Sequence, residues 1–217
     1  MLFLHNTSQV NDEPYPKLLQ EKGFRGFPTL CFMDADGNVL TKPTARTVAN
    51  FVETQAATKD LMVLKAKGDK LTDAEAKQLF LTELNMDMIA AGDIQKRADA
   101  VKGLSEADMA LVAGKIVDGE FSAILQRPIP RGDAAAQKTA MEETMAQVAA
   151  MAKAGKVPTG QRTLQFWSMA LQHAANAKDV ELAEKAFAAL EGSPDAKRMP
   201  PQRRDGWKKL LDQAKGN

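Results

Sequence analysis

Apolar and polar positions divide the chain into a short first part with strand-like spacing and a long second part with helical spacing. Two apolar runs too short for a helix, Met1 to His5 and Phe27 to Met33, predict buried strands. Between them, Pro16 to Lys22 predicts a short helix. A polar turn over Asp34 to Asn38 and a returning run over Val39 to Thr41 complete a β-hairpin.

From Thr44 onward the apolar residues recur every three or four positions, which predicts helices to the end of the chain. Thr44 to Lys67 predicts one long or two short helices, with Val48, Phe51 and Val52 facing the hairpin. A further helix is expected to begin at a capping box over Thr72 to Glu75. The remaining expected helices cover Met86 to Lys102, Ser105 to about Pro128, Asp133 to Ala154, Thr159 to Ala177 and Asp179 to Leu190, and a last helix begins at about Pro201. The fold class is therefore α+β and mostly α.

Several large side chains in the second part allow two interpretations. Met141, Met145 and Val148 share one face of a helix, and we interpret them as soft core packing rather than as a peptide groove. Trp167 and Trp207 could anchor a partner, but packing of helix on helix is the interpretation we favour.

The helical hairpin over residues 159–194 is weakly similar to a tetratricopeptide unit. Trp167, Ala183, Phe187 and Pro194 fall near the positions of that motif, whereas Leu171 stands where the motif prefers a small residue. No second copy follows at a fixed period. A helical-repeat array therefore stays open as an alternative.

Charge composition argues against two classes of partner. The 29 basic and 28 acidic residues give a formal net charge of +1, too even for the positive field that nucleic acid or an anionic membrane requires. Basic residues gather only between Ala196 and Asn217, where Trp207, Leu210 and Leu211 run through them at helical spacing. We expect a protein or peptide partner, and neither nucleic acid nor membrane.

Metal and cofactor chemistry finds little support in the sequence. Cys31 is the one cysteine, so the chain has no internal disulfide, no CxxC pair and no cysteine zinc cluster. His5 and His173 lie far apart without acidic or cysteine partners at ligand spacing. The hairpin turn accounts for Asp34, Asp36 and Asn38, whose spacing to Gly37 does not fit a calcium loop. We expect no metal and no cofactor.

One stretch carries a family resemblance. Gly23 to Leu40 has the sequence GFRGFPTLCFMDADGNVL, which resembles the second half of a thioredoxin domain: a glycine turn, an apolar residue, a proline, a threonine, an apolar strand and a D-x-x-G hairpin. The matching portion covers about Met1 to Thr58. The resemblance implies that Pro28 is a cis-proline and that Phe27, Pro28 and Thr29 form an edge that binds extended substrate. An ordinary trans step into an edge strand is the alternative.

The chemistry of that family needs two thiols, of which one attacks and the other resolves the mixed disulfide. This chain has only Cys31, three residues after Pro28, and we interpret it as a buried, inert thiol. The central strand that precedes the CxxC motif in the family also has no counterpart. Either the predicted strands pair directly, or open sheet edges recruit another chain and allow a dimer, or an upstream segment has been lost. We favour the last, since the pattern starts abruptly.

The expected localisation depends on whether an upstream segment has been lost. Met1 to Leu4 lacks the basic start and long apolar stretch of a signal peptide, so the chain as written is expected to be cytoplasmic. The helical extension resembles that of exported bacterial thioredoxin-family proteins, which implies a periplasmic or exported location if a signal peptide has been lost.

Two functional hypotheses result from this organisation, in which residues 1–58 form a thioredoxin-like half domain and residues 59–217 a helical domain. In the first, the chain is a thioredoxin-like protein whose parent family exchanges thiols and disulfides but which is itself redox-inert. In the second, the helical domain is a scaffold that binds protein partners.

Overall fold

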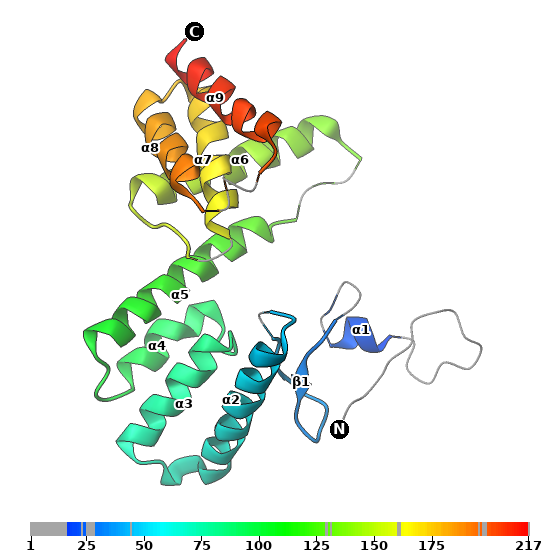
Figure 1. Cartoon of the computed structure of the whole chain (residues 1–217), viewed down its shortest axis with the longest axis vertical. Helices are drawn as coiled ribbons and strands as arrows, with labels where there is room; N and C mark the ends of the chain where they lie inside the picture. The colour runs from blue at the N-terminus through cyan, green and yellow to red at the C-terminus, as the bar shows by residue number, and fades with distance from the viewer. Residues whose placement is uncertain are drawn as a thin grey trace, which may run out of the picture. The chain divides into compact units, whose positions relative to one another are not determined.

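The computed structural model describes residues 17–22, 24, 29–43, 45–128, 130, 132–159, 162–194, 196 and 199–216. Of these residues 72% are helical, and the sheet they form has two antiparallel strands (Figure 1). The expected fold class, α+β and mostly α, is confirmed. The expected strand at Met1 to His5 lies outside the described residues.

By their internal contacts the residues form two compact units. The first comprises Met1–Ile89 with Val101–Gly103, and the second comprises Ala90–Ala100 with Leu104–Asn217. The boundary expected near residue 58 stays a prediction that rests on the family resemblance. That position lies inside a continuous helix, α2, which belongs entirely to the first unit.

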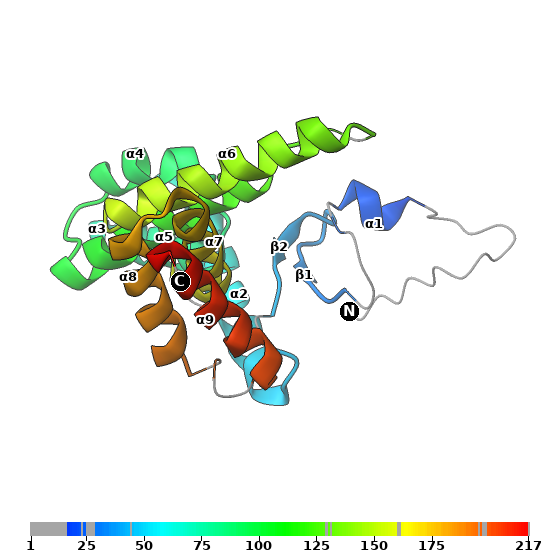
Figure 2. The same ribbon diagram turned by 90° about the horizontal axis from the view of Figure 1, so that it is seen from above.

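The first unit contains a hairpin and helices. Its elements are α1 (Leu18–Glu21), β1 (Phe32–Met33), β2 (Val39–Thr41), α2 (Val48–Lys67), the 3₁₀ turn η1 (Gly68–Lys70) and α3 (Asp73–Asn85). Figure 2 shows the two strands side by side.

The hairpin is held by its turn more than by its short ladder. Asp34 Oδ1 accepts hydrogen bonds from the backbone N–H groups of Asp36, at 3.0 Å, and Asn38, at 2.8 Å. Gly37 has φ of 77°, a conformation that glycine adopts without steric cost. In β1 only Phe32 and Met33 pair with β2, and the register shifts between them. The strand expected over Phe27 to Met33 is therefore shorter than predicted where the structure describes it.

Helix α2 begins where a threonine can cap it. Thr47 Oγ1 accepts from the N–H of Asn50 at 3.2 Å, and the helix continues unbroken to Lys67. The Phe51 ring packs against the Phe32 ring of the hairpin, with centroids 6.3 Å apart. The expectation that Val48 and Val52 also face the hairpin is wrong, because they are 82% and 59% exposed.

Helix α3 starts at the capping box expected from the sequence. Thr72 Oγ1 accepts from the N–H of Glu75 at 3.3 Å, while the Glu75 carboxylate accepts from the N–H of Thr72 at 3.1 Å. Phe80 and Leu84 on α3 are 1% exposed, and the side chains of α2 that face them are also buried. The first unit thus has its core between α2 and α3.

In its described residues the second unit contains helices and no strand. Its elements are the 3₁₀ turn η2 (Ala91–Asp93), α4 (Ile94–Asp99), α5 (Glu106–Leu125), α6 (Ala134–Lys153), α7 (Thr163–Ala177), α8 (Val180–Gly192) and α9 (Pro201–Lys215). The helix expected over Met86 to Lys102 is wrong in extent. Asp87, with φ of 55°, ends the preceding helix, and regular helix resumes only at Ile94.

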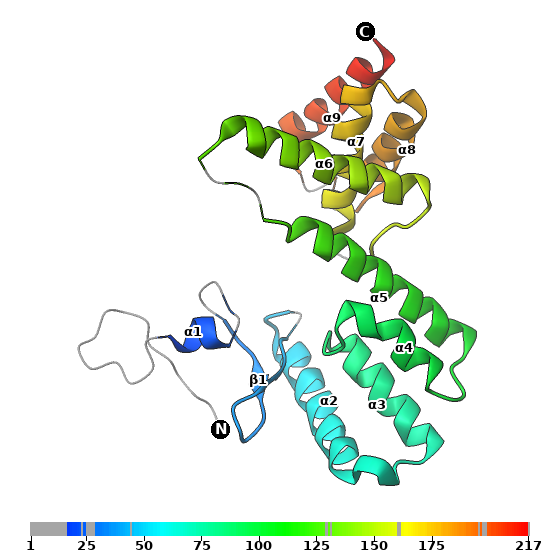
Figure 3. The same ribbon diagram turned by 180° about the vertical axis from the view of Figure 1, so that it is seen from behind.

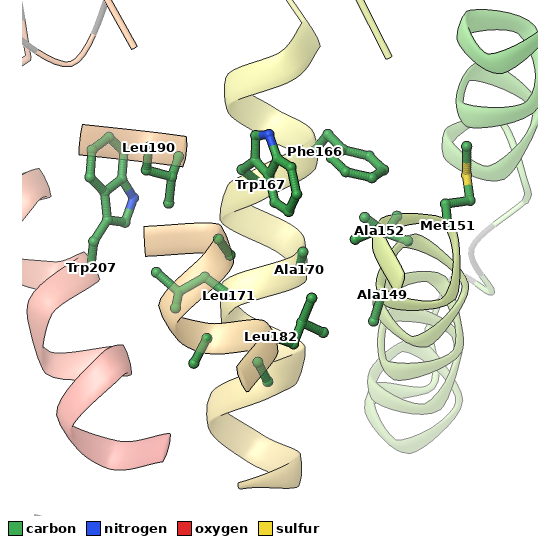
Figure 4. Close-up of a cluster of buried hydrophobic side chains, with 14 of the residues drawn as sticks. Ala149, Met151, Ala152, Phe166, Trp167, Ala170, Leu171, Leu182, Leu190 and Trp207 are labelled. Carbon is green, nitrogen blue, oxygen red and sulfur yellow. The ribbon is translucent and has the colours of Figure 1, made fainter. Parts of the chain in front are cut away.

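Helix α7 lies at the centre of this unit and packs against α6, α8 and α9 (Figure 3). Small side chains let the helices approach closely, and the alanines at these contacts are 0% exposed: Ala170, Ala174, Ala183 and Ala186. The Phe166 ring lies edge-on to the Trp167 ring, with centroids 5.2 Å apart (Figure 4). It also lies edge-on to the Phe121 ring, with centroids 5.4 Å apart.

The burial of the large side chains decides between their two interpretations, core packing and partner binding. Trp167 and Trp207 are both 6% exposed, which confirms them as core residues. Val148 is fully buried, but Met141 is 50% exposed, so the core interpretation is wrong for Met141. Met145 is half-buried. The α7–α8 hairpin forms as expected, while its likeness to a tetratricopeptide unit stays a prediction.

Candidate functional site

Of the three residues expected to bind substrate, the structure describes one. Phe27 and Pro28 lie outside the described residues, so the cis conformation stays a prediction. Thr29 is half-buried and stands three residues before β1. The described part of the candidate edge is therefore Thr29 to Met33.

Cys31 lies in this edge, directly before β1. It is half-buried, so the expectation of a thiol buried inside a strand is wrong: the two-residue ladder begins after it. Burial raises the pKa of the Cys31 thiol, and the positive charges of Lys42 and Lys22 offset that rise only in part. Because the thiolate is the nucleophile, the thiol is less reactive at neutral pH than a free cysteine.

The same edge exposes apolar side chains. Leu30 is 40% exposed and Met33 is 37% exposed. The sheet order is β1-β2, so within the described residues β1 has one edge without a strand partner. An exposed strand edge with apolar side chains on it can take up an extended polypeptide by main-chain pairing.

A second concave surface of the first unit lies beside β2. It encloses about 590 Å³ and is lined by β2, α2 and the residues that follow α3. Its described charged residues, Lys42, Glu53 and Asp87, carry both signs. The left-handed conformation of Asp87 is explained by the end of α3, where the N–H of Met88 donates to Glu83 O at 2.9 Å in a Schellman-type closure. This surface therefore shows no single ligand chemistry.

The second unit has a groove between α6, α7 and α9. It encloses about 510 Å³. Its lining residues are Met145, Leu164, Gln165, Ser168, Met169, Gln172, Met199, Arg203 and Trp207. From the sequence, Trp207 is a possible anchor, and Met145 is interpreted as core packing rather than as part of a peptide groove. No local pattern predicts that α6, α7, α9 and the connection before α9 bring these residues together.

No metal centre is formed by the part of the chain that the structure describes, where no group of three or more His, Cys, Asp or Glu side chains comes together. The Asp34 carboxylate serves the hairpin turn, and hydrogen bonds from Asn38 lower its pKa. His5 lies outside the described residues, and His173 is half-buried on α7. Among the described helices, none is both long enough and apolar enough to span a membrane.

Comparison of the chain with protein-family models, with curated proteins and with solved structures finds no match.

Proposed function

We propose that this chain is a thioredoxin-like polypeptide-binding protein whose own residues carry out no thiol-disulfide exchange. The observation that carries the proposal is the hairpin-helix unit: a D-x-x-G turn joins β1 to β2, and α2 follows and packs on the hairpin through Phe51 and Phe32. The family resemblance implies this order of elements after the substrate-binding proline.

Binding is assigned to the edge that leads into β1. An extended polypeptide would pair with the main chain of this edge, and its alternate side chains would contact Leu30 and Met33. The expected partner is thus an unfolded or extended protein segment, in agreement with the even charge of the chain.

The proposed lack of redox activity follows from the number of cysteines in the chain and from the raised pKa of Cys31. Disulfide reduction needs one thiolate to attack and a second to release the mixed disulfide, and Cys31 has no second cysteine in the chain. Burial raises the pKa of Cys31, which also slows the first step.

Insulin reduction by dithiothreitol tests the inert part of the proposal. We expect neither the wild-type chain nor Cys31→Ala to accelerate the reaction. Acceleration by the wild type that is absent in Cys31→Ala would contradict the proposal, because it would show that Cys31 exchanges with disulfides.

Fluorescence anisotropy with labelled, reduced and carboxymethylated α-lactalbumin tests the binding part, since this probe is unfolded and has no free thiols. Met33→Lys places a charge on the edge and is expected to weaken binding about tenfold. The matched control is Met62→Lys on α2, where the methionine is 46% exposed. If the two changes weaken binding equally, the edge from Thr29 to Met33 is not the binding site.

A second candidate function is favoured by a separate observation. The groove between α6, α7 and α9 is a preformed concave surface on a densely packed helical unit. Such a surface supports the hypothesis that the helical part is a scaffold for a protein partner.

A further inference from the structure

The groove of the second unit has an apolar floor with adaptable walls. Trp207 and Leu164 contribute bulk, while Met145, Met169 and Met199 reach it from three different parts of the chain. Methionine has an unbranched, polarizable side chain that adjusts to differently shaped apolar ligands. About 510 Å³ is enough to receive a few apolar side chains of a partner.

The polar residues of the groove are unevenly distributed. Gln165, Ser168 and Gln172 lie along one face of α7 and carry no charge. Arg203, on the first turn of α9, is the one charged residue among the described lining residues. Its guanidinium makes no ion pair with any side chain that the structure describes.

A fixed positive charge at the rim of an apolar groove selects the sign of the ligand. A carboxylate next to an apolar stripe would place its charge near Arg203 while its neighbours fill the groove, and guanidinium and carboxylate can form two parallel hydrogen bonds. A lysine at the same place would be repelled.

We propose that the groove between α6, α7 and α9 binds an amphipathic helix of a partner protein that carries an acidic residue beside its apolar stripe. A helix satisfies its own backbone hydrogen bonds, so it can enter an apolar groove without donors from the wall. This inference rests on the second candidate function and names the partner for it. It is independent of the edge before β1.

The test uses the full chain and two fluorescein-labelled peptides of about 16 residues, long enough to form helix. Both carry leucine at positions i, i+3, i+4 and i+7 on an alanine background, and one has glutamate where the other has lysine. Fluorescence anisotropy is expected to show that the acidic peptide binds at least about tenfold more tightly than the basic one. The difference should shrink as salt is raised.

Arg203→Glu tests the charge. It is expected to weaken binding of the acidic peptide by about tenfold or more and to strengthen binding of the basic peptide. The matched control is Arg204→Glu, which makes the same change one residue along α9 outside the groove lining and should leave both affinities within about twofold. Either glutamate in the first turn of α9 is compatible with the helix dipole, so both variants should fold.

Met145→Ala tests the apolar wall, with Met141→Ala as its control one turn earlier on α6. Met145 lines the groove and Met141 does not. We expect Met145→Ala to weaken binding several-fold and Met141→Ala to leave it unchanged. Circular dichroism of each variant shows that the helices are retained.

Three results would overturn the inference: equal binding of the two peptides, equal effects of Arg203→Glu and Arg204→Glu, or a dimer in sedimentation equilibrium that Met145→Ala dissociates, which would make a second copy the occupant. Met33→Lys should leave peptide binding in the groove intact. Loss of groove binding therefore does not speak against the edge before β1, and loss of edge binding does not speak against the groove.

Discussion

The two compact units use their apolar residues in different ways. In the second unit, large side chains such as Phe121, Phe166 and Leu171 are 0% exposed and gather around α7. In the first unit, α2 leaves Val48, Val52 and Val63 exposed at 82%, 59% and 60%. Both units have a buried core, and the most exposed large apolar side chains of the described residues lie on α2 of the first unit.

The difference indicates a division of roles. A densely packed helical unit holds the backbone around the groove in a fixed geometry, which lowers the cost of binding, while the methionine side chains of the groove adjust to the ligand. The apolar side chains at the edge before β1 offer contact area for another polypeptide.

The largest effect is expected for Phe166→Ala. The ring is fully buried between Phe121 and Trp167, so its removal leaves a cavity and should reduce the free energy of unfolding of the second unit by about 3–5 kcal/mol. Both tryptophans belong to the second unit, so urea unfolding followed by tryptophan fluorescence reports this unit alone.

The contrasting change is Val48→Ala on α2. Because Val48 is 82% exposed, circular dichroism should show a change in unfolding free energy below about 0.5 kcal/mol, and the fluorescence transition should not move. A loss at Val48 comparable to that at Phe166 would contradict the contrast between the units.

A smaller loss than at Phe166 is expected for Gly119→Ala on α5. A Cβ at this position would lie 2.5 Å from the Cβ of Ala91, so the backbone of η2 must shift, at a cost of about 1–3 kcal/mol. Gly114→Ala on the same helix meets only Thr159 Cγ2 at 3.7 Å and should stabilise by up to about 1 kcal/mol. Thermal unfolding of both variants gives the comparison, and a stabilising Gly119→Ala would be the contrary result.

Among the destabilising changes, the smallest loss is expected at the cap of α8. Asp179 accepts from the N–H of Leu182 at 3.1 Å and pairs with Lys153 Nζ at 2.6 Å, and Asp179→Ala should cost about 1 kcal/mol at pH 7. Lys153 first, and then the Leu182 N–H, lower the pKa of Asp179 in the folded chain. The stabilisation is therefore complete above the unfolded carboxyl pKa of about 4 and is lost as pH falls through the lowered folded value.

Urea unfolding by fluorescence from pH 7 to pH 2.5 checks this dependence. Asp179→Asn is the control, because it keeps a cap acceptor and loses the charge, so its stability difference from Asp179→Ala should not vary with pH. A difference between wild type and Asp179→Ala that stays constant to pH 2.5 would speak against the assignment.

Features set by neighbouring residues could be predicted from the sequence. The capping box at Thr72, the helix start at Ser105 and the tight turn after Asp34 depend on hydrogen bonds within a few residues, and the structure has them where they were expected. Helices α6, α8 and α9 also begin within one residue of the expected positions, whereas α7 begins at Thr163 and not at Thr159. Hydrophobic spacing alone also gave the correct fold class.

Features set by distant residues could not be predicted. Which side of α2 is buried depends on α3, so Val48 and Val52 were placed on the wrong face. The half-buried state of Cys31 depends on where pairing with β2 begins. The groove forms only when three helices come together. Arg203 is recognisable as a distinctive residue only once the other described residues that line the groove are known to be uncharged.

The short connection between α7 and α8 has a consequence for how the chain folds. Only Lys178 and Asp179 separate the two helices, and Lys178 takes the left-handed conformation that reverses the chain. Closing so short a loop costs little chain entropy, and α6 to α9 pack mainly against helices nearby in sequence. The second unit is thus expected to fold quickly, with the α7–α8 hairpin as a local nucleus.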